Sequence, residues 1–351
     1  MAPYILMLVI SAFCAFLEDS ISSQRQKRNV FALALLPYFV LMAFKASSIG
    51  ADTYGYFQSY AAMANYDFSN FLLMDDFGYE RIEKGYKFYI WLLTRVSSDG
   101  QFLIIVTSAI STIALYSFIK DNAYNKSLAL FFFITLGFFQ FAMTGIRQLI
   151  SISISLLGVR YIKEQKLLKY IIIIFLATQF HTSAVFFFPA YFIARMKTNR
   201  KNICLSIISI VVLYLVGNEV LFMAADILEY DYGIEQTGNG YIFFVLVMLI
   251  TILSVISRNK LVSRRNENFI LLNLNFISLA TWTLRLISRT AERVSLYYMP
   301  FTYVLLEQYI SLGGRNKKLL KYIIVIVLCS ILFLRRISNQ SELNHYKFFF
   351  S

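Results

Sequence analysis

Arginine recurs at a regular interval in one stretch of the sequence. Arg285, Arg289 and Arg293 lie four residues apart, so on a helix they would share one face over about two turns. Like charges stacked in this way repel unless an anion lies among them, and the planar guanidinium matches phosphate and carboxylate groups with paired donors. The spacing therefore favours a site for an anionic substrate. Binding of lipid headgroups is the alternative.

Three further side chains have the chemistry of a general base. His181 is one of 2 histidines, and an imidazole changes its charge near neutral pH. Asp52 and Glu83 are carboxylates, which act as bases where partial burial weakens their acidity. The alternatives are that His181 is a satisfied structural group and that each carboxylate is paired with a neighbouring cation. We interpret the second histidine, His345, as incidental.

Other kinds of chemistry lack their sequence patterns. A lone histidine without Cys, Asp or Glu at ligand spacing argues against a zinc site. The 3 cysteines are scattered through apolar stretches and form no CxxC pair. Neither a P-loop, a GxGxxG turn nor a GxSxG elbow occurs, so nucleotide binding and a hydrolase triad have no support. We therefore expect no metal and no cofactor.

The composition indicates the kind of element that must position these side chains. Of the residues 58% are hydrophobic and 15% charged, whereas soluble domains carry about 25% charged residues. Apolar runs near helical spanning length argue against an outer-membrane barrel. The net charge of +13 does not indicate nucleic acid here, because most Lys and Arg lie in short loops between apolar runs, where they set orientation. We expect an all-α integral membrane protein.

The apolar runs and the basic loops between them predict a polytopic helical bundle. About twelve crossings result, in a single domain of residues 1–351 with both termini on the outer side of the membrane. The expected crossings are Tyr4–Phe16, Val30–Ala46, Phe102–Ile119, Leu128–Thr144, Leu149–Ile162, two short helices within Tyr170–Ala194, Cys204–Gly217, Tyr241–Ile256, Phe269–Leu284, Val294–Ile310 and Tyr322–Leu334. Basic groups flank both ends of Tyr170–Ala194, so the chain should turn back near Gln179–Ser183.

A long polar stretch, Ser47–Gln101, interrupts the apolar runs, and its acidic balance suits the outer side. Within it, Tyr86–Val96 is apolar and aromatic but only about two-thirds of spanning length. We therefore expect an interfacial or re-entrant helix in a long outer loop.

The same orientation brings most of the ionisable candidates to the outer face. They are Arg81, Glu83, Arg147, His181, Arg285, Arg289 and Arg293. Ionisable groups near membrane depth usually serve a pathway or a site. Arg147 follows Gly145 at an outer turn, and its alternative role is to reach towards lipid headgroups.

Short motifs in a fixed order resemble the EpsG family of polysaccharide polymerases, which are similar in role to Wzy-type polymerases. The matching residues are Gly50-Ala-Asp52-Thr53 with Tyr56, Arg81-Ile-Glu83-Lys-Gly85-Tyr86, Ile146-Arg147-Gln148, His181-Thr-Ser183-Ala184, Arg293 with Tyr297, and His345-Tyr346-Lys347-Phe348. The resemblance spans almost the whole chain, and the ordered combination is its specific part. One departure is Lys45, where the family often has arginine; lysine loses the bidentate geometry of a phosphate clamp.

The resemblance implies a polymerase that joins polyprenyl-diphosphate-linked oligosaccharide repeats. It would act at the outer face of the bacterial cytoplasmic (inner) membrane, as a multi-pass protein of exopolysaccharide, capsule or O-antigen synthesis. Membrane lipids, a chain-length regulator and other polysaccharide-export proteins are the implied partners. A flippase or exporter of the same lipid, or an O-antigen ligase-type glycosyltransferase, is the alternative; a flippase would more typically have pseudo-symmetric halves.

This reaction assigns roles to the candidate residues. Arg147, Arg289 and Arg293 would hold the diphosphate, with Gln148 and Arg285 as further binding residues. His181 ranks first as base, ahead of Glu83 and Asp52. Arg81 would assist in sugar handling, and Tyr56 and Tyr86 would stack on sugars.

Overall fold

The part of the protein that the structure describes is built mainly from helices. In this computed structural model the described residues are 1–74, 82–227 and 240–350, and the regular elements named among them are all α- or 3-10 helices. The prediction of an all-α protein is thereby confirmed. The chain divides into two compact units: unit 1 comprises Met1–Leu157, Gln179–His181 and Gly313–Ser351, and unit 2 comprises Gly158–Thr178 and Thr182–Leu312.

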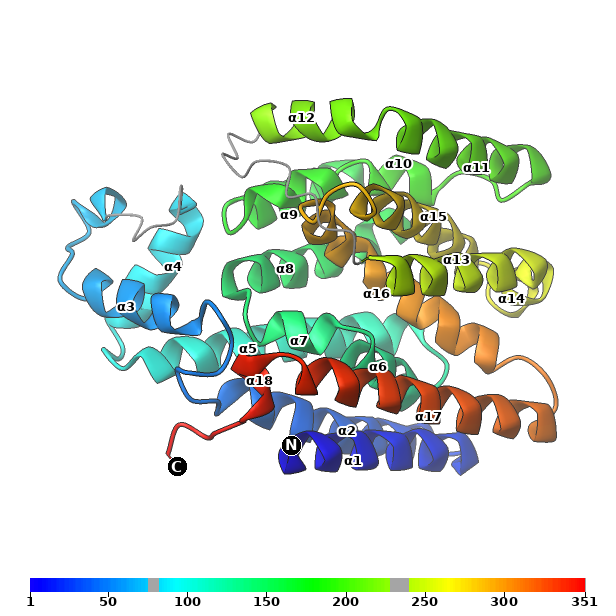
Figure 1. Ribbon diagram of the computed structural model, residues 1–351, viewed down its shortest axis with the longest axis horizontal. Helices are drawn as coiled ribbons and strands as arrows, with labels where there is room; N and C mark the ends of the chain where they lie inside the picture. The colour runs from blue at the N-terminus through cyan, green and yellow to red at the C-terminus, as the bar shows by residue number, and fades with distance from the viewer. Residues whose placement is uncertain (75–81, 228–239, 351) are drawn as a thin grey trace. The chain divides into compact units, whose positions relative to one another are not determined.

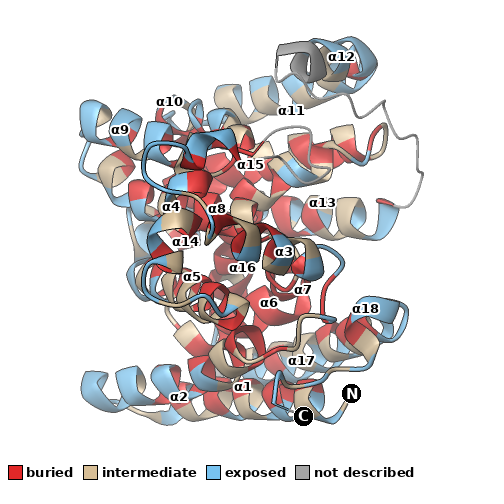
Figure 2. Ribbon diagram, turned by 90° about the vertical axis from the view of Figure 1, so that its left-hand side faces the viewer, coloured by how far each residue is buried: buried red, intermediate tan, exposed pale blue. Residues whose placement is uncertain are grey.

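Unit 1 contains the two N-terminal helices and the last long helix of the chain. Its elements are α1 (Ala2–Ser20), α2 (Gln24–Ala43), α3 (Thr53–Met63), η1 (Phe71–Leu73), α4 (Lys84–Thr94), α5 (Gly100–Asn122), α6 (Lys126–Thr135), α7 (Phe138–Ala142), the part of α8 (Ile146–Lys163) up to Leu157, α17 (Arg315–Ser338) and α18 (Ser341–Asn344). α1 lies along α2, and α6 packs against α1, α2 and α17 (Figure 1). All residues of α6 after the first are buried, so α6 forms the centre of this unit (Figure 2).

A buried carboxylate from α1 fixes the start of α6. Glu18 is 1% exposed and accepts hydrogen bonds from the backbone N–H groups of Lys126 (3.2 Å) and Ser127 (2.8 Å). The first N–H groups of a helix lack partners within it and carry partial positive charge, so a carboxylate there is stabilising. The cap therefore ties the connection between α5 and α6 to the end of α1.

The predicted crossing Leu128–Thr144 is wrong as one continuous helix. α6 ends at Thr135, and α7 begins at Phe138 after Gly137, whose φ is 103°. The nearest atom to a Cβ at Gly137 would be Nη1 of Arg336 in α17, the end of a flexible side chain that can move, so it is the backbone conformation that requires glycine. Hydrophobicity alone does not reveal this break, because the residues on both sides of Gly137 are apolar.

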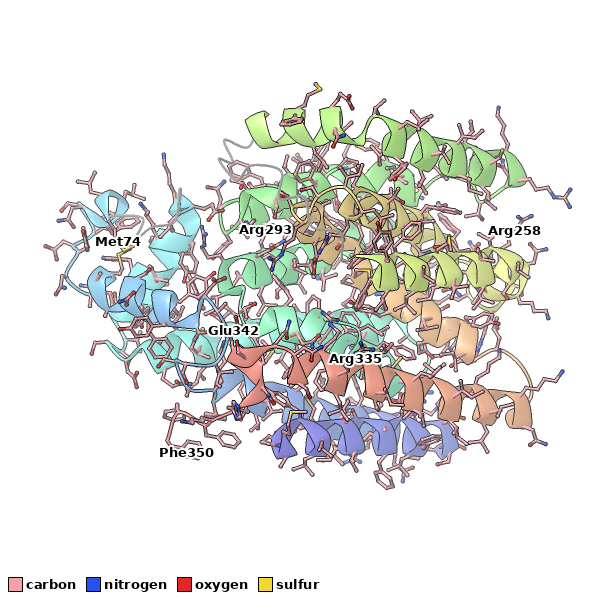
Figure 3. All side chains as sticks on the ribbon, in the orientation of Figure 1. Met74, Arg258, Arg293, Arg335, Glu342 and Phe350 are labelled. Carbon is pink, nitrogen blue, oxygen red and sulfur yellow. The ribbon has the colours of Figure 1, made fainter. Side chains whose placement is uncertain are left out.

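The polar stretch between α2 and α5 builds helices of its own. α3, η1 and α4 turn apolar side chains onto α5 and the start of α8, and Figure 3 shows one of them, Met74, beside α3 and α4. The buried members of this core are Tyr56, Tyr60, Met63, Phe71, Met74, Ile82, Tyr86, Ile90, Leu93, Leu103, Ile104, Ile146 and Ile150. α4 occupies most of the predicted Tyr86–Val96 helix, so the prediction of a helix within the loop is confirmed.

Unit 2 is organised around one pair of long helices. Its elements are the end of α8, α9 (Leu167–Thr178), η2 (Thr182–Phe187), α10 (Ala190–Ala194), α11 (Arg200–Leu215), α12 (Gly217–Ile227), α13 (Tyr241–Ile256), α14 (Arg258–Arg264), α15 (Asn268–Arg285) and α16 (Ala291–Ile310). α15 packs along α16, and α10, α11 and α13 pack against α15 (Figure 1).

The segment after α9 doubles back within unit 2. The Tyr170 hydroxyl, at the start of α9, donates to the Phe187 carbonyl at 2.5 Å, and the rings of Tyr170 and Tyr191 lie 5.4 Å apart. The two ends of the segment are therefore neighbours. The predicted turn near Gln179–Ser183, between two short helical stretches, is confirmed.

Several of the apolar helices have the dimensions of membrane spans. Among the described residues, α1 and α5 are long and apolar enough to cross a membrane, and two bent pairs, α11 with α12 (77°) and α13 with α14 (71°), qualify if each pair counts as one span. Their length and apolar composition are consistent with a helical membrane protein. The count of about twelve crossings is not confirmed, since other predicted runs form short or interrupted helices such as α6 and α9.

Candidate functional site

The predicted site residues fall in both units, and each group is described within its own unit. Unit 1 holds Asp52, Tyr56, Glu83, Tyr86, Arg147, Gln148 and His181. Unit 2 holds Arg285, Arg289 and Arg293. Arg81 lies outside the described residues.

A buried ion pair joins the long loop to α8. The Arg147 Nη1 lies 2.8 Å from the Glu83 Oε2, and the two side chains are 13% and 8% exposed. Glu83 is the residue before α4 and Arg147 lies in the first turn of α8, so the pair connects the beginnings of two helices. Of the two readings of Glu83 from the sequence, the paired carboxylate is the one found, with Arg147 as its partner.

The position of Arg147 is unfavourable for a cation without compensation. The first turn of a helix carries partial positive charge, which repels a guanidinium and attracts a carboxylate. Burial acts to lower the pKa of Arg147, but the neighbouring Tyr56 and Glu83 outweigh burial and raise it above its usual value. Arg147 is therefore held as a cation in a place where only specific neighbours make it stable.

Two tyrosines complete the surroundings of this ion pair. The Arg147 guanidinium hydrogen-bonds the Tyr56 hydroxyl, and burial raises the pKa of Tyr56 although Arg147 opposes the shift. The rings of Tyr56 and Tyr86 meet edge to face at 6.2 Å, and both side chains are buried. The structure thus brings together Tyr56, Tyr86, Glu83 and Arg147, which the sequence placed in three separate motifs.

Gly85 explains how α4 reaches the segment that carries the candidate histidine. A Cβ at Gly85 would lie 2.5 Å from the Cβ and 2.6 Å from the carbonyl oxygen of Gln179, so only glycine fits there. The next N–H along the chain, that of Tyr86, donates to the Gln179 carbonyl at 3.0 Å. Phe180 packs edge to face on Tyr89 of α4, with ring centres 5.9 Å apart. The first turn of α4 therefore holds residues 179–181 in place.

His181 lies along the same face of α8 as Arg147. Its carbonyl is 3.5 Å from the Ser151 hydroxyl, which donates to it, and Ser151 is one turn after Arg147. His181 is 6% exposed and Gln148, beside Arg147, is 5% exposed. His181, the predicted base, and Gln148, a predicted binding residue, are thus both buried near the start of α8.

Asp52 takes a different position from the other two candidate bases. It is exposed and precedes α3, one turn before Tyr56, whose N–H donates to the Asp52 carbonyl at 3.2 Å. Its neighbour Gly50 has a φ of 93°, and a Cβ there would lie 2.3 Å from the Met143 carbonyl oxygen. The glycine of this motif therefore lets the turn before α3 lie directly against the end of α7.

Lys45 has a role that the sequence did not reveal. Its buried ammonium donates to the carbonyls of Ile49 (3.3 Å) and Met143 and to the Thr53 hydroxyl (2.8 Å). An ammonium has three N–H donors, which equals the number of these acceptors. Lys45 therefore ties the Gly50 turn to the residues before Arg147. The nearby glycine was the available signal that the chain makes a close approach here.

The arginines of unit 2 do not line one helix face, so that prediction is wrong. Arg285 ends α15, Arg289 lies in the turn that follows, and Arg293 is in the first turn of α16. The spacing of four residues is therefore not helical across residues 286–290. Arg285 is buried and its Nε lies 2.8 Å from the Glu292 Oε2, whereas Arg289 and Arg293 are exposed.

Comparison with protein families gives a match over nearly the whole chain. The model of the EpsG family matches residues 28–350. The match includes every site residue described above, in both units. Neither a curated protein nor a solved structure matches the chain.

Proposed function

Because this chain belongs to the EpsG family, we propose that it joins lipid-linked oligosaccharide repeats into a longer glycan. Family membership indicates a polysaccharide polymerase-like function and therefore a glycosyltransferase-like enzyme. The proposed donor is the growing glycan on polyprenyl diphosphate, and the proposed acceptor is a second lipid-linked repeat. The proposed place is the outer face of the cytoplasmic membrane, in exopolysaccharide, capsule or O-antigen synthesis.

The proposed reaction is a displacement at the anomeric carbon of the donor. A hydroxyl oxygen of the acceptor forms a new bond to that carbon, while the bond from the carbon to the diphosphate oxygen breaks. The hydroxyl proton passes to a base, and the diphosphate leaves with the electron pair of the broken bond. The protein must therefore stabilise negative charge on the leaving group and accept one proton.

The buried Glu83–Arg147 pair is the observation that carries this proposal. A guanidinium suits a diphosphate because its planar donors match phosphate oxygens, and a buried guanidinium interacts with an anion more strongly than an exposed one. In this proposal Glu83 and Tyr56 orient Arg147 towards the diphosphate, and Gln148 adds a neutral donor beside it. Tyr86 supplies aromatic surface next to Tyr56.

His181 is the proposed base. It is buried in a segment that the first turn of α4 holds through Gln179, and its carbonyl lies along the face of α8 that carries Arg147. Glu83 is less suited, since its carboxylate is 2.8 Å from a cation that competes for the same electron pairs. Asp52 is exposed at the start of α3 and serves in this proposal as a sugar-binding residue.

The exposed arginines of unit 2 are a second proposed cation set. Arg289 and Arg293 lie in and just after the turn between α15 and α16, where they are accessible to an anionic ligand. Arg285 differs from them because it is buried and paired with Glu292. We assign Arg289 and Arg293 to diphosphate binding and Arg285 to holding the turn.

Deletion of the gene tests the proposed activity in cells. A strain without this protein should lose long surface glycan and accumulate single repeats on lipid at the outer face of the membrane. Repeats trapped at the cytoplasmic face would contradict the proposal and would indicate a flippase. Complementation with Arg147→Ala or His181→Ala should fail at normal protein levels, whereas Tyr54→Phe, a change at an exposed side chain of α3, should restore the glycan.

A further inference from the structure

The last residues of the sequence fold back along unit 1. Glu342–Phe350 follows α17, and we call it the C-terminal strap; Figure 3 labels both of its ends. The hydroxyl of Tyr4 in α1 donates to the Leu343 carbonyl at 2.9 Å. The hydroxyl of Tyr346 donates to the Leu41 carbonyl of α2 at 3.0 Å. The strap is therefore fixed to both N-terminal helices.

Beyond these contacts the strap pairs with the residues after α2 as an antiparallel partner. The Ala46 N–H donates to the Lys347 carbonyl, and the Phe349 N–H donates to the Phe44 carbonyl, both at 3.0 Å. The residue between these two bonds is Lys45, which stands opposite Phe348 in an isolated antiparallel bridge. The pairing thus holds the backbone of Lys45 from both sides.

The strap thus holds Lys45 and the Gly50 turn, which contact the residues just before Arg147. Lys45 joins the Gly50 turn to the Met143 carbonyl, four residues before Arg147. The strap also contacts that turn directly, since the Gly50 N–H donates to the Glu342 carbonyl at 3.3 Å. A continuous set of contacts therefore runs from the strap through Lys45 and Gly50 to the end of α7.

We propose that the C-terminal strap is a positioning element of the site: it fixes the turn that carries Lys45 and Gly50 and thereby sets the places of α3 and of Arg147. The strap acts through its backbone: its Phe349 N–H donates to Phe44, and its Lys347 and Glu342 carbonyls accept from Ala46 and Gly50, so these bonds matter more than its side chains. Its effect on glycan synthesis rests on the proposed function, whereas its hold on the Gly50 turn does not.

Two variants at one position separate the backbone bond from the side chain. Phe349→Pro removes the N–H that donates to Phe44, and the matched variant Phe349→Ala keeps this N–H and removes the ring. Both are purified as the full chain in lipid nanodiscs, and hydrogen exchange is measured for peptides covering residues 44–50. Peptides covering Lys126 and Ser127, whose N–H groups bond to Glu18, report on the rest of unit 1. The same variants are expressed in the deletion strain, and glycan length is measured.

In Phe349→Pro the strap should detach from Phe44, so the N–H groups of Ala46 and Gly50 lose the Lys347 and Glu342 carbonyls. We therefore expect exchange in residues 44–50 to rise about tenfold, while exchange at Lys126 and Ser127 is unchanged. Glycan should shorten in Phe349→Pro and stay normal in Phe349→Ala. Unchanged exchange in residues 44–50 would overturn the strap's hold on the turn. Faster exchange with normal glycan would overturn its role in the site. If even the wild type made no glycan, the proposed function would fail, and the exchange data would still decide whether the strap holds the turn.

Discussion

At the scale of single residues, the proposed binding site depends on the buried ion pair of Glu83 and Arg147. Removing one partner of a buried ion pair leaves the other charge without compensation, which typically costs about 3–5 kcal/mol of folding free energy. We expect Glu83→Gln and Arg147→Met each to be strongly destabilising. The double variant should be less destabilised than the sum of the two, because it leaves no unpaired charge. Thermal unfolding of the four proteins in one detergent measures this coupling.

A coupling energy near zero in that cycle would contradict the buried pair. The matched control is a cycle between Lys166 and Glu164, which also form an ion pair, at 2.7 Å, but with both side chains about half exposed. Exposed pairs contribute little to stability because water and salt screen them, so the control cycle should show little coupling.

Gly85 permits the second prediction at this scale. In Gly85→Ala the new methyl group would overlap the backbone of Gln179, and we expect displacement of the first turn of α4 with a cost of about 1–3 kcal/mol. Glycan synthesis should fall with it, since the same turn holds His181. Gly314→Ala is the control, because its φ is −70° and a Cβ there meets nothing within 4 Å. Equal stability of the two variants would show that the close approach is not required.

The sequence identified most of these residues but not their partners. Charge type and position marked Glu83, Arg147 and His181 as candidates. That Glu83 pairs with Arg147, 64 residues away along the chain, depends on how α4 packs on α8, which no local pattern records. Gly50 and Gly85 were the informative residues, because at each of them two stretches of backbone approach closely.

At the scale of elements, α4 is apolar on two opposite faces. Tyr86, Ile90 and Leu93 are buried in the hydrophobic core that α3, η1 and α4 form with α5 and the start of α8. The opposite face exposes Phe88 (44%) and Leu92 (50%), spaced one turn apart. An exposed apolar stripe of this kind suits the boundary between headgroups and acyl chains, so we propose that α4 is the interfacial helix expected from the sequence.

The depth of Trp91 tests this placement. With Trp282→Phe, Trp91 is the remaining tryptophan of the 2 in the sequence. In proteoliposomes we expect its fluorescence to be quenched more by lipids brominated near the headgroup than by lipids brominated deep in the chain. Quenching by aqueous iodide alone would contradict an interfacial α4.

Breaks within elements were the weak part of the sequence prediction. The run Leu128–Thr144 is mostly apolar on both sides of Gly137, so its hydrophobicity gave no sign that Gly137 divides α6 from α7. The regular spacing of Arg285, Arg289 and Arg293 suggested one helix face, although the chain turns between the first and the last. The break before Thr182 was predictable, because basic residues flank that segment on both sides.

At the scale of the whole molecule, polymerisation at the outer face requires the long loop, residues 47–101, to face outward. Leu73 in this loop is 77% exposed, and Lys260, among the basic residues of α14 that are expected on the inner side, is also exposed. In a background without the three natural cysteines, Leu73→Cys should react with a membrane-impermeant maleimide in intact cells, and Lys260→Cys should react only after the cells are opened. The reverse labelling pattern would show that the loop faces the cytoplasm, and the proposed site would then not lie at the outer face.

Synthesis of glycan by the isolated protein tests the central proposal most directly. Purified protein in proteoliposomes is supplied with a polyprenyl-diphosphate-linked repeat unit, and the products are separated by length. We predict a ladder of longer glycans, with release of one polyprenyl diphosphate for each bond formed. Arg147→Ala, reconstituted in the same amount, should give no ladder. A lipid-linked repeat that crosses the bilayer without becoming longer, or a ladder that persists in Arg147→Ala, would contradict the proposal.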